Sequence, residues 1–152
     1  MKKSSQSGFT LIEVAIVLGL IGVIAAFGVA MSFSSLSSTN VTQERDLFVT
    51  LLLQGTRAAA IANMEETDHG VQIDNINHRY ILFNGTSYDK NAASNRFVPY
   101  TSGTITVTNT GGDTVVFEQL SGDVMTGAGV ITITNGNAVQ EITIRDSGQI
   151  DW

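Results

Sequence analysis

A long apolar run close to the N-terminus places the strongest constraint on the fold. Residues 8–27 read GFTLIEVAIVLGLIGVIAAF, and residues 14–31 are apolar or glycine throughout. The next charge after Glu13 is Glu44, so thirty consecutive positions between them are uncharged. A helix of about 20 apolar residues is long enough to cross the hydrocarbon core of a bilayer. The run therefore predicts one transmembrane helix near the start of the chain.

Two lysines set the expected orientation of this helix. Lys2 and Lys3 precede the run, and positive residues beside a membrane helix tend to stay cytoplasmic. We therefore expect a single-pass protein with a cytoplasmic N-terminus and an extracytoplasmic C-terminal domain. A secretory signal peptide shares the basic start, but its apolar core has only about 7–15 residues. The longer run, with no small-x-small cleavage pattern behind it, favours a retained helix.

The composition limits what the exported part can do. The chain has no cysteine, which excludes disulfide staples and thiol redox chemistry. Its formal net charge is −6, and from residue 66 onward ten Asp and Glu residues face four Lys and Arg residues. An acidic surface repels polyanions on average. Nucleic acid is therefore an unlikely partner.

A single carboxylate at the beginning of the membrane run needs an explanation. An ionised Glu at the centre of a membrane helix costs about 2.5–3.5 kcal/mol, and such residues usually have a partner. Glu13 has none within the apolar run. A simple membrane anchor could place it at the bilayer interface, without any special purpose.

The residues around Glu13 favour a different explanation. The stretch SGFTLIEV, residues 7–14, resembles the processing motif of type IV pilins and type II secretion pseudopilins. In that family, prepilin peptidase cuts after the glycine, here Gly8, and N-methylates the new terminal residue, here Phe9. The resemblance makes Glu13 the fifth residue of the mature chain, where the family carries its characteristic glutamate.

The spacing of cut site and carboxylate has a physical meaning. Removal of residues 1–8 deletes both lysines and leaves a cationic amine on Phe9, at the end of an apolar helix. Inside a filament, this amine and Glu13 can compensate one another between neighbouring subunits. An unpaired buried charge is costly, so the register in which the pair forms is selected. We therefore interpret Glu13 as a filament-assembly residue and not as a catalytic acid.

Residues 42–63 read as an amphipathic continuation of the membrane helix. We expect one long helix, bent or frayed within residues 34–40, whose apolar stripe packs on a sheet. The stripe consists of Phe48, Leu52, Ala59 and Ala62, with Leu47, Leu51 and Ala58 beside it. The charged residues expected to face water or neighbouring subunits are Glu44, Arg45, Asp46 and Arg57.

Short β-branched or alternating runs follow from residue 69 and predict strands. They are GVQID, RYILF, TITVT, TVVFE, VITIT and EITIR. The clearest hairpin signal is TNGN, residues 134–137, because Asn-Gly suits a type I′ turn. The sequence thus predicts an α+β fold, a long N-terminal helix packed on an antiparallel sheet or small two-sheet sandwich. Its segments are a cleaved leader (1–8), a transmembrane and filament-core helix (9–33), an amphipathic helix (34–65) and an extracytoplasmic β domain (66–152).

Three later stretches narrow the resemblance. LLLQGTRAAAIANMEETDHGVQI, VVFEQLSG and EITIRDSGQIDW resemble the GspH/FimT group of minor pseudopilins and minor pilins. This likeness implies a low-copy subunit, inserted in the bacterial inner membrane and then incorporated at or near the tip of a periplasmic or extracellular filament, where it helps to prime assembly. Its implied partners are other major and minor subunits, prepilin peptidase and the inner-membrane assembly platform. Type II secretion and type IV pili remain equally open.

An enzyme has little support in the sequence, and we expect no catalytic residue, no cofactor and no metal. His69 and His78 lack the spaced ligands of a zinc site, and no Gly-x-Ser-x-Gly elbow occurs. Asp113 and Asp123 lie in glycine-containing turns, where calcium could bind but turn formation is the ordinary explanation.

Two other functions remain as alternatives. Some FimT-like minor pilins serve DNA uptake, which requires phosphate contacts by basic residues. The β domain offers four candidates for such contacts, Arg79, Lys90, Arg96 and Arg145. A membrane-anchored adhesin would instead use the loop at residues 84–95, with Tyr88 as a contact, while Tyr80 and Tyr100 are expected to pack inside the domain.

Overall fold

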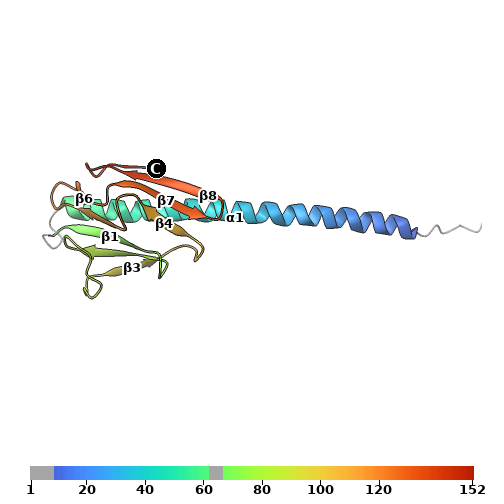
Figure 1. Ribbon diagram of the computed structural model, residues 1–152, viewed down its shortest axis with the longest axis horizontal. Helices are drawn as coiled ribbons and strands as arrows, with labels where there is room; N and C mark the ends of the chain where they lie inside the picture. Colours follow the sequence, from blue (N-terminus) through green and yellow to red (C-terminus); the bar gives the residue numbers. More distant parts are fainter. Residues whose placement is uncertain (1–8, 62–66) are drawn as a thin grey trace, which may run out of the picture. The chain divides into compact units, whose positions relative to one another are not determined.

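The computed structural model describes residues 9–61 and 67–152, leaving aside the side chains of residues 29–35 and 57–61. In this part of the chain one helix, α1 (Leu11–Ile61), is followed by nine strands (Figure 1). The strands are β1 (His69–Asp74), β2 (Arg79–Asn84), β3 (Arg96–Pro99), β4 (Thr106–Asn109), β5 (Thr114–Phe117), β6 (Val124–Thr126), β7 (Gly129–Asn135), β8 (Ala138–Ile144) and β9 (Ile150–Asp151). The predicted α+β class is confirmed.

Helix α1 continues through the serine-rich stretch at residues 34–40, where we expected fraying. Just beyond that stretch, the hydroxyl of Thr42 donates to the carbonyl of Ser38 at 3.1 Å. This is a bond to the carbonyl four residues earlier, a type that helices tolerate and that often bends them slightly. The single proline of the chain is Pro99, in β3, so no proline interrupts α1. The prediction of one long helix is therefore confirmed and the alternative of fraying within residues 34–40 is wrong, whereas a bend there stays a prediction.

The chain divides between Leu36 and Ser37 into two compact units, which are described separately. In the first unit, every described side chain from residue 9 to residue 28 is exposed on the surface of the helix. In the second unit, the remaining turns of α1 pack with the described strands around one hydrophobic core. We call the second unit the β domain.

The strands of the β domain form two antiparallel sheets. The first has the order β3-β2-β1-β5-β6 and the second the order β4-β7-β8-β9. In the first sheet, Val71 of β1 lies opposite Leu82 on one side and Val115 on the other. In the second, Ile131 of β7 lies opposite Ile142 of β8. The six predicted strand runs are all present, whereas β3, β6 and β9 were not predicted.

The hairpin between β7 and β8 is present, but its turn differs from the prediction. Asn135 is still paired with Ala138, so the two central residues are Gly136 and Asn137, not Asn135 and Gly136. Of these two central residues only Gly136 has a positive φ, of 60°. Glycine at the first central position is the pattern of a type II′ turn, so the expected type I′ turn is wrong.

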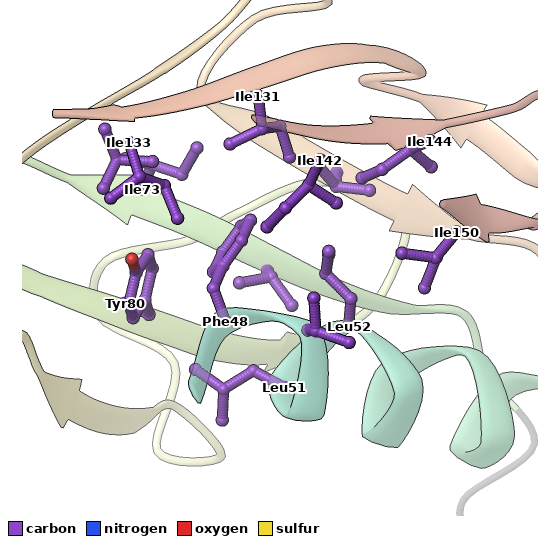
Figure 2. Packing of buried hydrophobic residues seen from close by; sticks show 14 of the residues in the cluster. Phe48, Leu51, Leu52, Ile73, Tyr80, Ile131, Ile133, Ile142, Ile144 and Ile150 are labelled. Atoms are coloured by element: carbon purple, nitrogen blue, oxygen red, sulfur yellow. The ribbon is translucent and has the colours of Figure 1, made fainter. Parts of the chain in front are cut away.

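The core lies between α1 and the inner faces of both sheets. Phe48 and Leu52 of α1 are fully buried and point toward the strands (Figure 2). They meet Ile73 and Tyr80 of the first sheet and the isoleucines of the second, which are Ile131, Ile133, Ile142, Ile144 and Ile150. Leu51 is also buried and Leu47 is half-buried, as the amphipathic pattern predicted. The side chains of Ala58 and Ala59, and all of Ala62, lie outside the described residues.

Gly55 allows α1 to approach the first sheet closely. A Cβ at this position would lie 3.3 Å from Cδ2 of Phe117 in β5. Phe117 is fully buried, so its ring has little room to withdraw. A larger residue at position 55 would push the helix away from the sheet.

Glu44 contradicts the prediction that it faces water or another subunit. Its side chain is fully buried, and its Oε2 accepts bonds from the backbone N–H and the hydroxyl of Thr101, both at 2.7 Å. Oε1 has no hydrogen-bond partner among the described residues. The neighbouring charges fit the prediction better, because Asp46 is exposed and Arg45 is partly exposed. The side chain of Arg57 lies outside the described residues.

Two tyrosines lie close to the buried carboxylate of Glu44. The ring of Tyr80 stacks on Phe48 at 4.5 Å between centroids and lies 4.6 Å from the ring of Tyr100. Burial, together with the charge of Glu44, raises the pKa of both phenols above the ordinary value. Tyr100 also donates to Oδ1 of Asn75, whose amide bonds the backbone of β4. Hydrogen bonds thus connect α1 to the β3–β4 connection, and connect that segment through Asn75 to β4 of the second sheet.

Candidate assembly site at the start of the helix

The first turn of α1 is closed by a side-chain cap. The backbone N–H of Glu13 donates to the hydroxyl of Thr10 at 3.3 Å, and Thr10 immediately precedes the helix. Threonine at the cap and glutamate three residues later form the capping-box sequence T-x-x-E. Glu13 is also the acidic residue of the first helical turn, where the helix dipole favours negative charge. The T-x-x-E pattern is visible in the sequence, but we did not predict a helix cap from it, so Thr10 was missed.

Phe9 and Glu13 lie along one apolar groove of the first unit. The groove has a volume of about 230 Å³ and is lined by Phe9, Glu13, Val14, Val17 and Leu18. Phe9 is 84% exposed. Among the described residues, no cation pairs with the carboxylate of Glu13. The two residues that we expected to act in assembly are therefore close together and open to another molecule.

An unbroken apolar surface continues from this groove along α1. The segment Leu11–Gly28 is long and apolar enough to cross a membrane, and none of it is buried inside the chain. At Gly19 and Gly22 a Cβ would meet nothing within 4 Å, so packing inside the chain does not require glycine there. Small residues at such positions let neighbouring helices approach each other closely. This part of α1 has the properties expected of a helix that packs with other helices or with lipid.

The start of α1 thus combines a capped N-terminus, a carboxylate in the first turn and an exposed apolar surface. Residues 3–29 match the prokaryotic N-terminal methylation motif. The match supports a type IV pilin-like protein, which prepilin peptidase processes and which assembles with other pilin subunits. It includes Gly8, Phe9 and Glu13, although Gly8 itself lies outside the described residues. No curated protein and no solved structure matches the chain significantly.

The candidate metal ligands of this pilin-like protein lie apart. Within residues 9–61 and 67–152, no three His, Asp or Glu side chains lie together in a way that could hold an ion. The ring of His78 instead makes an edge contact with Tyr100 at 6.0 Å. Asp113 and Asp123 lie directly before β5 and β6, and their backbone carbonyls accept the N–H groups of Ile73 and Glu118.

Two of the four candidate DNA-binding cations are paired within the β domain. Arg79 bonds Asp74 at 2.9 Å and lies over the ring of Phe97, 4.4 Å from its centroid. Arg145 bonds Asp151, also at 2.9 Å. Burial alone would raise the pKa of Asp74, but bonds from Asn77 and Arg79 outweigh it and lower the pKa. These contacts leave less positive charge available for phosphate groups.

The loop suggested for an adhesin, residues 84–95, is ordered by its own contacts. The amide of Asn95 donates to the carbonyl of Asp89 at 2.7 Å, and the backbone of Asn91 bonds the Asp89 carboxylate. Tyr88 is half-buried and its ring lies 5.7 Å from that of Phe83. Tyr88 therefore packs on the domain, and Tyr80 and Tyr100 are buried as expected.

Proposed function

We propose that this pilin-like protein is a minor pilin or pseudopilin, a structural subunit at or near the tip of a type IV pilus or type II secretion pseudopilus. It helps to prime assembly and turns over no substrate. The observation that supports this role most directly is the exposed apolar surface of α1 at Leu11–Gly28, which carries Glu13 in its first turn and lies within the residues that match the methylation motif. The later stretches that resemble the GspH/FimT group support the minor-subunit role.

The proposed mechanism follows from the first turn of the helix. The precursor sits in the inner membrane, with its N-terminus cytoplasmic and its β domain outside. Cleavage after Gly8 creates a cationic amine on Phe9, whose side chain lies along the same groove as Glu13. In the dry core of a filament, the carboxylate of one subunit and the amine of its neighbour satisfy each other. A subunit placed out of register leaves a buried charge unpaired, which typically costs several kcal/mol.

The first experiment separates charge pairing from helix capping. Glu13→Ala removes the carboxylate, whereas Thr10→Val removes the cap and retains the carboxylate. We expect Glu13→Ala to insert in the membrane and to be processed, but to be strongly depleted from sheared filaments. Thr10→Val should be incorporated nearly normally, because a lost N-cap costs only about 1 kcal/mol. Equal recovery of Glu13→Ala and wild type in the filament fraction would refute the pairing mechanism.

The second experiment tests the cut site. Mass spectrometry of the membrane form should show a chain that starts at Phe9 and carries one added methyl group. Gly8→Leu should accumulate at the mass of the precursor. A mature-sized product from Gly8→Leu would refute the assigned cut site.

The third experiment tests the position in the filament. Immunogold labelling of the β domain should mark filament ends, and deletion of the gene should lower filament number while leaving filament length unchanged. Labelling along the whole shaft would contradict a minor subunit at the tip.

A further inference from the structure

One pocket of the β domain combines the guanidinium of Arg96 with a buried ring nitrogen of His69. It lies where α1 meets the first sheet and has a volume of about 250 Å³. Its apolar wall is formed by Leu82 and Phe83. The polar side chains that line it are those of Gln54, His69, Asn84, Ser94 and Arg96.

The charge of this pocket is unusual for so acidic a chain. Arg96 supplies a permanent cation, and among the described residues no Asp or Glu lines the pocket. Arg96 forms no ion pair or hydrogen bond with the part of the chain that the structure describes. Asp68, which immediately precedes the pocket residue His69 in the sequence, is engaged elsewhere, because its Oδ1 accepts the N–H of Gln119 at 2.7 Å.

His69 is the second group that lacks a partner. Its Nε2 is buried and makes no hydrogen bond with the described residues. A buried donor without a partner costs about 1–3 kcal/mol, so an occupant that accepts from the ring would be stabilised. The χ2 torsion of histidine is broad, which lets the imidazole turn a nitrogen toward the cavity.

A second groove of the domain serves as a comparison. It is larger, about 440 Å³, and contains both Arg79 and Lys90. However, it also contains Asp74 and Asp113, and Arg79 is already bonded to Asp74. Charge compensation within the chain leaves this groove without a strong preference for an anion. In the pocket at Arg96, no acidic group from residues 9–61 or 67–152 compensates the charge in this way.

We infer that the pocket at Arg96 and His69 binds an oxyanion, either a carboxylate or a phosphate group. The guanidinium of Arg96 presents planar donors that match the two oxygens of such a group. The hydroxyl of Ser94 and the amide of Gln54 supply further donors from the rim. A volume of about 250 Å³ is below the usual range for drug-sized ligands, which favours one small anionic group. A carboxylate could come from another subunit, since the chain itself carries fourteen Asp and Glu residues.

The test follows the imidazole signals of the full processed chain in detergent micelles by NMR. Sodium phosphate and sodium acetate are titrated separately, with NaCl keeping the ionic strength constant. We expect a saturable shift of the His69 signal, while the His78 signal stays in place as an internal reference. The anion that binds more tightly identifies the group, phosphate or carboxylate. The absence of a saturable shift with both anions would overturn the inference.

Matched variants separate a specific site from general attraction. R96Q and K90Q each remove one positive charge, but only Arg96 lines the pocket. R96Q should weaken binding about tenfold or more, because it removes a charge-assisted bond. K90Q should change the affinity by less than about twofold, since exposed charges are screened by salt. Equal weakening by both variants would overturn the assignment of a site.

A third variant removes competition from within the chain. Glu65 and Glu66 precede β1 in the sequence and could supply a carboxylate of their own. In the E65Q/E66Q variant, an affinity equal to or higher than that of the wild type supports the site. A clear loss of affinity contradicts it, because these carboxylates would then be needed for binding.

Discussion

The buried Glu44 gives the sharpest test of how the β domain is held together. Glu44→Ala removes both acceptor bonds to Thr101 and leaves a small void beside Tyr80. Each bond to a charged acceptor is worth about 1.5–3 kcal/mol, whereas release of the carboxylate from burial returns several kcal/mol. With the void included, we expect a net loss of about 2–4 kcal/mol in the free energy of unfolding. For a domain of about this size, that corresponds to a fall of roughly 8–16 °C in Tm.

The assay is thermal and denaturant unfolding of the processed protein in detergent, followed by near-UV circular dichroism. Asp46→Ala is the matched control, because it changes an acid two residues away whose side chain is 58% exposed. Its pair with Arg45 at 2.7 Å is a surface pair, so the expected loss is below about 1 kcal/mol. Glu44→Gln should lie between the two, because its amide oxygen can still accept from Thr101. A Glu44→Ala protein as stable as Asp46→Ala would refute the reasoning.

Three further predictions follow from the packing of the domain. The pKa of Tyr80 and of Tyr100 is raised, so these phenols ionise first in the unfolded chain. The free energy of unfolding should therefore fall above about pH 10, by roughly 1.4 kcal/mol per pH unit for each phenol. Tyr80→Phe should halve this slope in denaturant titrations, and an unchanged slope would contradict the prediction. Because the pKa of Asp74 is lowered in the folded state, its contribution to the free energy of unfolding is present above its ordinary pKa and is lost as the pH falls through the folded value. The difference in denaturant midpoint between wild type and Asp74→Asn should therefore vanish in strong acid. A difference that stays constant with pH would argue against this role of Asp74. Gly55→Leu should destabilise the domain by about 1–3 kcal/mol in thermal unfolding, because the new side chain meets Phe117. Gly19→Leu, in the open apolar segment, should leave the unfolding of the domain unchanged. Equal effects of the two variants would contradict the close approach of α1 to the first sheet at Gly55.

Much of the fold was predictable because its signals are local. The apolar run, the stripe through Phe48 and Leu52 and the alternating strands each show a period that identifies the element. The strands β3, β6 and β9 have four, three and two residues, and each lies at the edge of a sheet. Two or three residues are too few to show alternation, which explains β6 and β9, whereas β3 ends at Pro99, a residue that is disfavoured inside strands.

Glu44 shows a different reason for failure. Val41, Glu44, Phe48 and Leu52 recur at helical spacing and are all buried, so position 44 falls on the inner face of α1. Its charge led us to place it in water, although the period alone would have placed it correctly. The group that makes burial possible is Thr101, which lies 57 positions away. No sequence signal connects the two residues.

The candidate assembly site was predictable in its residues but not in its local geometry. Phe9 and Glu13 were found by resemblance, and the methylation motif covers both. The bond from Glu13 to Thr10 was missed because the carboxylate already had an explanation. The pocket at Arg96 could not be predicted, since its lining residues come from α1, β1, β2, β3 and the segment before β3.

The continuity of α1 has a mechanical consequence. Its backbone is hydrogen-bonded from Leu11 to Ile61, and its later turns form one wall of the hydrophobic core. Within the β domain, from Ser37 onward, a load applied along the helix therefore acts directly on the core, because the same turns form its wall. That load would act as shear along the helix axis on the core contacts of Phe48 and Leu52. It would act in the same way on the hydrogen bonds from Thr101 to Glu44.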